Sequence, residues 1–166
     1  HLEQDSSYEF EGIRTYRKHK LDKEHGFLIL QDYLPNVKEW RIIRIGDYYF
    51  GFEKVIIGEF HSGSQNFDYG MPPDNCLDLA KEVTEKYNFK YVSIDIFLTS
   101  DGLCLINEIQ PYFAQKDDRE LLRINNETGA LFFNQFDKKW KFEKGKFCKN
   151  NMSNLRIKEI IKQLNK

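Results

Sequence analysis

The sequence has no long apolar run, few cysteines and almost no net charge. None of its apolar runs approaches the ~20 residues that a membrane-spanning helix needs, so we expect no membrane partner. The formal net charge of −1 gives no electrostatic reason to expect a nucleic acid as a ligand. Cys76, Cys104 and Cys148 are too far apart in sequence for a disulfide framework or a metal knuckle. Free thiols are typical of a reducing compartment, so we expect a cytoplasmic protein.

The length and the composition are those of a small globular protein. With 166 residues, 40% of them hydrophobic and 31% charged, the chain can bury a core as a single domain over 1–166. The opening residues HLEQDSS contain neither an initiator Met nor an apolar signal segment. We therefore expect the chain to be a part of a longer protein.

Hydrophobic periodicity and turn residues divide the chain into helices and hairpins. The dipeptide Gly46-Asp47 between two β-rich segments predicts a hairpin, and the Pro- and Gly-containing stretch 58–73 predicts a long loop. Apolar residues at helical spacing predict a helix that Asp74 caps. This order predicts an α+β fold, with an antiparallel sheet and flanking helices. The expected elements are a helix over 8–25, strands over 27–33, 40–45, 48–57, 130–133 and 140–142, a hairpin over 93–110, and a last helix from Asn151 or Ser153.

The hairpin SIDIFLTSDGLCLINEIQ, residues 93–110, places two acidic side chains opposite each other. Asp101-Gly102 is typical of a two-residue hairpin turn. Counting outward from this turn, Asp95 pairs with Glu108, and Gln110 falls on the same face two residues later. The pattern therefore predicts two carboxylates and one amide on a single patch of the sheet.

Like charges directly opposite each other destabilise a sheet, so the pair needs an explanation. The face could be open to water, or one carboxyl group could have a raised pKa and stay protonated. Alternatively, a hard cation such as Mg²⁺ could bind between the two carboxylates. The geometry of the hairpin favours neither a solvated face nor a cation site over the other.

The sequence resembles the ATP-grasp ligases, in particular their RimK-like branch of carboxylate–amine ligases. Asp95 in SIDIF, a turn and Glu108 in NEIQ are similar to the metal-binding end of that family. Upstream, LILQDYLP resembles its adenine hinge, EWRIIRIGDYYFGF its acid-x-Arg strand and GEFHSG its GEFRSN loop. The resemblance covers about 27–111 and implies the C-terminal lobe of an ATP-grasp enzyme. Residues 112–166 would then be an extension with a small hairpin and a terminal helix.

The resemblance also implies the nucleotide-binding residues. Gln31, Asp32 and Leu34 would hold the adenine at the hinge, although an ordinary buried strand explains the same residues. Glu39 would hold the ribose hydroxyls, and Lys54 matches a second basic position of the family. The same two residues face each other across the hairpin, so they could instead be a plain cross-strand ion pair.

The remaining implied residues would act on phosphate and metal. Arg41 matches a catalytic position that contacts phosphate or an acidic substrate, which suits a bidentate guanidinium, although a solvated arginine is the alternative. Asp95 and Glu108 match the metal carboxylates, and Gln110 stands where the family usually has Asn. His61 replaces the family Arg in the loop.

The activity implied by the resemblance is an ATP- and Mg²⁺-dependent ligation through an acyl phosphate, with Mn²⁺ as an alternative metal. Its partners would be small acid and amine substrates and the N-terminal lobe of the same enzyme. The extension is similar to ATP-grasp proteins found with cell-surface polysaccharide genes, which suggests modification of such polymers or of peptides. Because nothing before Phe27 resembles the phosphate-covering loop of the family, we expect no ligation, and no substrate-dependent ADP release, from this chain alone.

Two alternatives belong to other functional classes. A non-catalytic module would bind Mg·ATP without turnover, and a small interaction domain would have no nucleotide site. In the interaction domain the acidic pair would be merely solvated, so replacing both Asp95 and Glu108 by amides would stabilise it slightly.

Overall fold

The computed structural model describes residues 7–10, 13–16, 32–55, 67–111, 113 and 120–165. The chain is divided into two compact units, His1–Pro35 and Asn36–Lys166. In the first unit, β1 (Ser7–Phe10) pairs antiparallel with β2 (Ile13–Tyr16). The helix predicted over 8–25 is therefore wrong for these residues. Aromatic and β-branched residues on both sides of a central glycine favour a hairpin, and the mixed charges had hidden that pattern.

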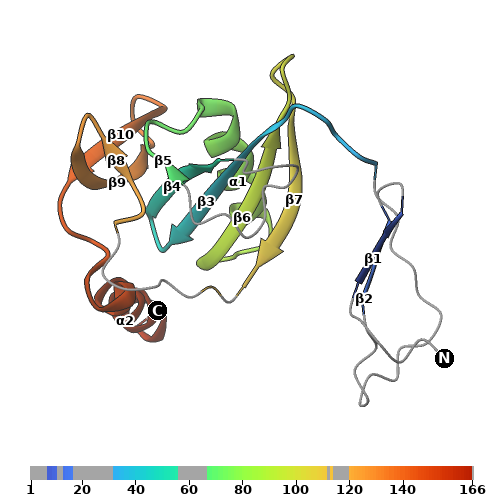
Figure 1. The fold of residues 1–166 in the computed structure, drawn as a ribbon. Helices are drawn as coiled ribbons and strands as arrows, with labels where there is room; N and C mark the ends of the chain where they lie inside the picture. Colours follow the sequence, from blue (N-terminus) through green and yellow to red (C-terminus); the bar gives the residue numbers. More distant parts are fainter. Residues whose placement is uncertain are drawn as a thin grey trace. The chain divides into compact units, whose positions relative to one another are not determined.

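The second unit is built on a large antiparallel sheet with the strand order β10-β9-β4-β3-β6-β7 (Figure 1). Two short strands flank this path, with β5 beside β4 and β8 beside β9. Together with the two α-helices of the described residues, the sheet confirms the predicted α+β class with an antiparallel sheet. The strands are β3 (Lys38–Ile45), β4 (Tyr48–Lys54), β5 (Phe67–Asp68), β6 (Tyr91–Leu98), β7 (Cys104–Gln110), β8 (Arg123–Ile124), β9 (Glu127–Asn134) and β10 (Lys139–Lys144).

The β3–β4 hairpin confirms the turn predicted at Gly46-Asp47. Gly46 has a positive φ of 60°, which glycine adopts without a steric penalty. The register pairs Ile45 with Tyr48 next to the turn, and Glu39 with Lys54 at the far end. Because side chains alternate along a strand, Glu39 and Arg41 lie on one face of the sheet.

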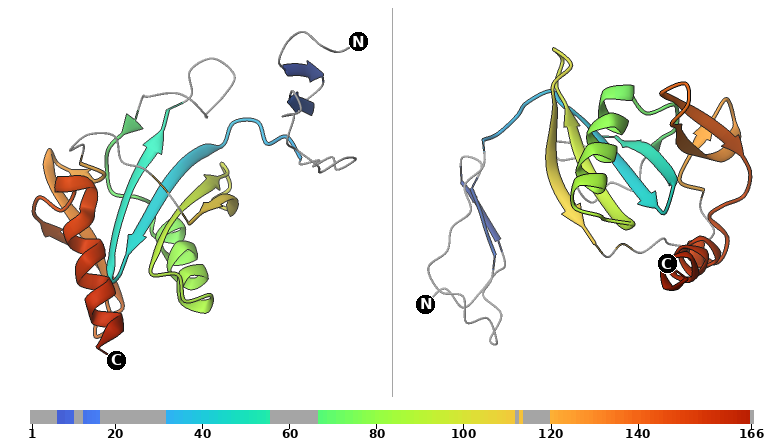
Figure 2. Two further views of the ribbon diagram at one scale, coloured as in Figure 1. Left: turned by 90° about the horizontal axis from the view of Figure 1, so that it is seen from below. Right: turned by 180° about the vertical axis from the view of Figure 1, so that it is seen from behind.

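The other face of the sheet is covered by α1 (Asp74–Lys86), as the view from behind shows (Figure 2). The helix buries Leu77, Ala80 and Thr84, whose spacing matches the helical period. Asp74 is the first residue of the helix, and Pro73 occupies the capping position, so the predicted side-chain cap is wrong. Cys76 of α1 and Cys104 of β7, distant in sequence, bring their Sγ atoms to 3.3 Å as free thiols.

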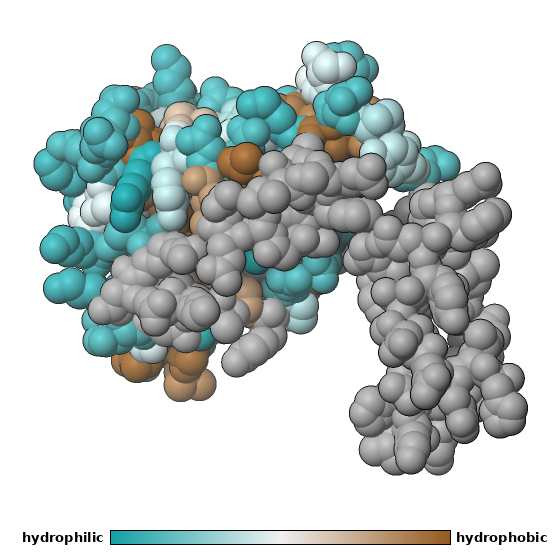
Figure 3. Space-filling view, in the orientation of Figure 1, coloured by the Kyte–Doolittle hydropathy of each residue, from teal (hydrophilic) through white to brown (hydrophobic). Residues whose placement is uncertain are grey.

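The face that carries Arg41 also carries aromatic residues of β4, with Phe52 opposite Arg41 and Phe50 opposite Ile43. Phe52 contacts Phe67 edge to face, and Phe50 contacts Phe147. The 3-10 helix η1 (Lys149–Met152) contributes the fully buried Met152 and leads into α2 (Ser153–Leu164). Ile157, Ile160, Ile161 and Leu164 of α2 are exposed, and hydrophobic side chains gather over α2 at the lower edge of this unit (Figure 3). Among the described residues, no helix is long and apolar enough to cross a membrane.

Candidate functional site

The predicted pairing of Asp95 with Glu108 is confirmed, although the turn that predicted it is wrong. The turn between β6 and β7 holds three residues, 100–102, because the backbone N–H of Thr99 donates to the carbonyl of Leu103 just beyond the strand ends. A β-bulge then follows between Asp95 and Ile96, where the register shifts by one residue. The longer loop and the bulge offset each other, so the two carboxylates still face one another.

Asp95 lies at the centre of a network of ion pairs that crosses three strands. Its carboxylate accepts two hydrogen bonds from Arg41, with Nε 2.7 Å from Oδ1 and Nη2 2.8 Å from Oδ2. Lys54 donates from Nζ to Oδ2 of Asp95 and to Oε1 of Glu39, at 2.6 Å each. The cross-strand pair predicted between Glu39 and Lys54 is therefore confirmed, and it belongs to a larger arrangement. We call Glu39, Arg41, Lys54, Asp95, Glu108 and Gln110 the charged face.

The network is nearly inaccessible to water at its acidic members. Glu39 and Asp95 are each 2% exposed. Burial alone would raise the pKa of Asp95, but the hydrogen bonds and charges of Arg41 and Lys54 outweigh it and lower the pKa below its usual value. Burial works to lower the pKa of Arg41, yet the hydrogen bond and charge of Asp95 raise it above its usual value. Asp95 and Arg41 are therefore both ionised at neutral pH.

The structure explains how the chain tolerates two opposed carboxylates. The positive charge of Arg41 offsets the negative charge of Asp95, because Arg41 lies directly across from it in the neighbouring strand β3. Glu108 is exposed to solvent, and its charge also acts on Arg41. Protonation of Asp95 does not contribute at neutral pH, since its pKa is lowered. Replacing Asp95 by an amide would leave Arg41 without its carboxylate and Lys54 with Glu39 alone, so the stabilisation expected for a merely solvated pair does not apply.

Gln110 extends the same patch towards Ser93. Ser93 pairs with Gln110 across the strands and therefore lies on the face of Asp95. Its hydroxyl is buried, and among the described residues it has no hydrogen-bond partner. Sequence reasoning did not single out Ser93, although its place two residues before Asp95 puts it on the same face.

The donor atoms of the charged face fit a hard divalent cation. Two carboxylates and an amide oxygen are ligands that Mg²⁺ prefers. Within the part of the chain that the structure describes, no three His, Cys, Asp or Glu side chains form a ready-made metal group. Both oxygens of Asp95 already accept hydrogen bonds, so a cation there would share this carboxylate with Arg41 and Lys54.

The remaining predicted residues lie elsewhere or outside the described chain. Asp32 and Leu34 belong to the first unit, in irregular chain, so the strand predicted over 27–33 does not include its last two residues. Gln31 and His61 lie outside the described residues, as do 27–30 of that strand. Comparisons of the chain with protein-family models, with curated proteins and with solved structures found no match.

Proposed function

We propose that this chain is the nucleotide- and metal-binding part of an ATP-dependent carboxylate–amine ligase of the ATP-grasp type. The observation that supports the proposal is the pairing of Asp95 with Glu108 on one face of the sheet, beside Arg41 and Lys54. Carboxylates that can hold a metal thus lie next to cations that can hold phosphate oxygens. The order of these residues along the chain is that of the family it resembles.

The charge of the face favours a metal-bound nucleotide over a free one. Among the described residues of the charged face, the carboxylates of Glu39, Asp95 and Glu108 stand against the two cations Arg41 and Lys54, which leaves one negative charge. A bare triphosphate would be repelled by this excess, whereas a divalent cation would be attracted. Asp95, Glu108 and Gln110 would hold Mg²⁺, which when bound offsets the charge of the phosphates.

The cations of the face can change partners when a nucleotide binds. Arg41 and Lys54 both donate hydrogen bonds to Asp95 in the free protein. Phosphate oxygens are equally good acceptors for a guanidinium and an ammonium group. Arg41 is the more available of the two, because its side chain is 25% exposed against 11% for Lys54. Arg41 would therefore contact the transferred phosphoryl group or the acidic substrate, and Lys54 would keep its bond to Glu39.

Catalysis by such a site needs no covalent nucleophile. Ligation through an acyl phosphate depends on positioning of the reactants and on charge stabilisation. The charged face offers fixed charges on β3, β4 and β6, and hydrogen bonds between strands hold them rigidly. The proposed reaction also requires an acid substrate, an amine substrate and the N-terminal lobe of the enzyme.

An amide-shift titration of the chain with a non-hydrolysable ATP analogue, with and without Mg²⁺, tests the proposal. We expect Mg²⁺-dependent shifts in β3 around Arg41 and in the β6–β7 hairpin around Asp95 and Glu108. As a control, the same titration is made on Glu127→Gln, which removes an acidic side chain that pairs with Lys144 on the surface. This variant should show the same Mg²⁺-dependent shifts as the unchanged protein. Shifts confined to other regions, or independent of Mg²⁺, would contradict the assignment.

A further inference from the structure

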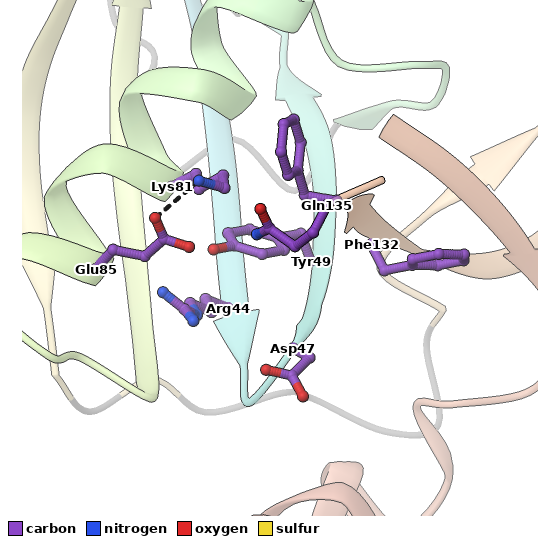
Figure 4. A pocket seen from close by; sticks show the side chains of 8 residues that line it. Arg44, Asp47, Tyr49, Lys81, Glu85, Phe132 and Gln135 are labelled. Carbon is purple, nitrogen blue, oxygen red and sulfur yellow. Dashed lines mark hydrogen bonds and ion pairs between the residues drawn. The ribbon is translucent and has the colours of Figure 1, made fainter. Parts of the chain in front are cut away.

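A cavity of about 350 Å³ lies on the face of the sheet that α1 covers (Figure 4). Arg44 of β3 lines the cavity. Successive side chains of a strand point to opposite faces, so Arg44 points away from the face of Arg41, on which Ile43 and Ile45 lie. The cavity is therefore on the side opposite the charged face, and it takes no part in the proposed function. Its walls come from α1, from the β3–β4 hairpin, and from β9 with the turn that follows it.

Arg44 is a buried cation whose hydrogen-bond acceptors, within the described part of the chain, are neutral groups. The residue is 5% exposed, and its guanidinium donates from Nε to the Gly46 carbonyl at 2.8 Å and from Nη1 to Thr84 Oγ1 at 2.7 Å. Both acceptors are neutral. Among the described residues, no ion pair includes Arg44. The charge of Arg44 contributes to lowering the pKa of Asp47, but the two residues form no ion pair, so a carboxylate bonded directly to this buried guanidinium would be favoured.

The two acidic residues of the cavity are already engaged. Asp47 pairs with Lys162 at 2.6 Å, and Glu85 pairs with Lys81 at 2.7 Å. The hydrogen bond to Lys162 is the main cause that lowers the pKa of Asp47. Each carboxylate of the cavity is thus bonded to a lysine, which leaves Arg44 as the one charged lining residue without an ion pair among the described residues.

The cavity also has aromatic walls that other side chains hold in place. The Tyr49 ring lies 5.3 Å from the Arg44 guanidinium and meets Trp140 edge to face, with centroids 4.9 Å apart. Phe133 meets the same Trp140 at 5.3 Å and carries the Lys81 ammonium over its ring. Ring faces and edges fixed in this way suit a flat apolar body. The volume is that of a small-molecule pocket.

We propose that this cavity binds a small aromatic monocarboxylate, with Arg44 as its anchor. A guanidinium carries five N–H groups, and Arg44 uses two of its nitrogens in the hydrogen bonds above, so donors remain for a carboxylate. The fork of N–H groups matches the two oxygens of a carboxylate. A single guanidinium without an ion pair matches the single charge of a monocarboxylate better than the two charges of a phosphate dianion. The aromatic body would lie against Tyr49 and Phe133, and Gln135 offers an amide at the same cavity.

The test compares benzoate with its neutral isostere benzamide, by residue-resolved amide-shift titration of the whole chain. We expect benzoate to shift resonances around Arg44, Thr84 and Phe133, and to bind roughly tenfold more tightly than benzamide or better. Arg44 also connects α1 to the β3–β4 hairpin, so a substitution there removes a structural contact as well. The comparison of the two ligands on the unchanged protein is therefore sufficient to test the proposal. Arg44→Gln should reduce benzoate affinity to the benzamide level. Arg123→Gln, which removes an arginine stacked on Tyr69, is the matched control and should bind as the unchanged protein does.

Three results would overturn the proposal. One is the absence of saturable benzoate shifts at millimolar concentrations, and another is equal affinity for benzoate and benzamide. The third is a set of benzoate shifts around Arg41 and Lys54, which would place the anion on the charged face. These outcomes leave the nucleotide proposal untouched, because that proposal is read from Mg²⁺-dependent shifts on the opposite face of the sheet.

Discussion

Replacing Asp95 by asparagine should destabilise the protein through its ion-pair network. The carboxylate accepts three charge-assisted hydrogen bonds of 2.6 to 2.8 Å from Arg41 and Lys54. Removing one partner of a buried ion pair typically costs about 3–5 kcal/mol, since the other charge stays buried and unpaired. Arg41 is partly exposed, and asparagine keeps one acceptor oxygen, so water and the amide recover a part of this loss. We expect a loss of about 2–3 kcal/mol in the free energy of unfolding.

Urea unfolding of Asp95→Asn at neutral pH measures this loss directly. A domain of this size is stable by about 5–15 kcal/mol, so the variant should still fold. Glu127→Gln again serves as the control, because the side chains of Glu127 and Lys144 are 49% and 69% exposed and such surface pairs contribute less than about 1 kcal/mol. A loss for Asp95→Asn as small as that of the control would refute the central place of Asp95 in the network.

Two further predictions concern acid stability and backbone packing. The lowered pKa of Asp95 contributes stability that is fully present above about pH 4 and is lost as the pH falls through the folded value. The difference in unfolding free energy between the unchanged protein and Asp95→Asn should therefore shrink below that pH in acid titrations. Gly51→Ala should cost about 1–3 kcal/mol, because its Cβ would lie 2.7 Å from Pro72 Cγ. Gly70→Ala, whose added Cβ has no heavy atom of a described residue within 4 Å, should change thermal stability by less than about 0.5 kcal/mol, and equal effects would contradict the packing argument.

The parts of the fold that could be predicted are those set by neighbours in sequence. Gly46-Asp47 determines the β3–β4 hairpin, and with it the pairing of Glu39 with Lys54, because a tight turn fixes the register. The helical period of apolar residues likewise predicted α1 and α2. That period did not predict burial, since the apolar face of α2 is exposed.

Pairings between distant segments decide the rest of the candidate site. Arg41 meets Asp95 because β3 pairs with β6, and 54 residues separate the two side chains. No short-range pattern specifies that pairing. The bulge beside Asp95 is equally hidden, because Asp101-Gly102 is typical of a shorter loop than the one observed. The cavity around Arg44 also depends on a distant partner, Thr84 of α1, which is 40 residues away.

The affinity for a non-hydrolysable ATP analogue, measured with and without Mg²⁺, tests the central claim most directly. Glu108 is exposed and makes no ion pair among the described residues, so Glu108→Gln should leave the fold intact. We predict that Mg²⁺ tightens nucleotide binding by the unchanged protein roughly tenfold or more, and that Glu108→Gln loses this gain while keeping its Mg²⁺-independent affinity. Equal affinity with and without Mg²⁺ in the unchanged protein, or a full Mg²⁺ effect in Glu108→Gln, would contradict a metal–nucleotide site on the charged face.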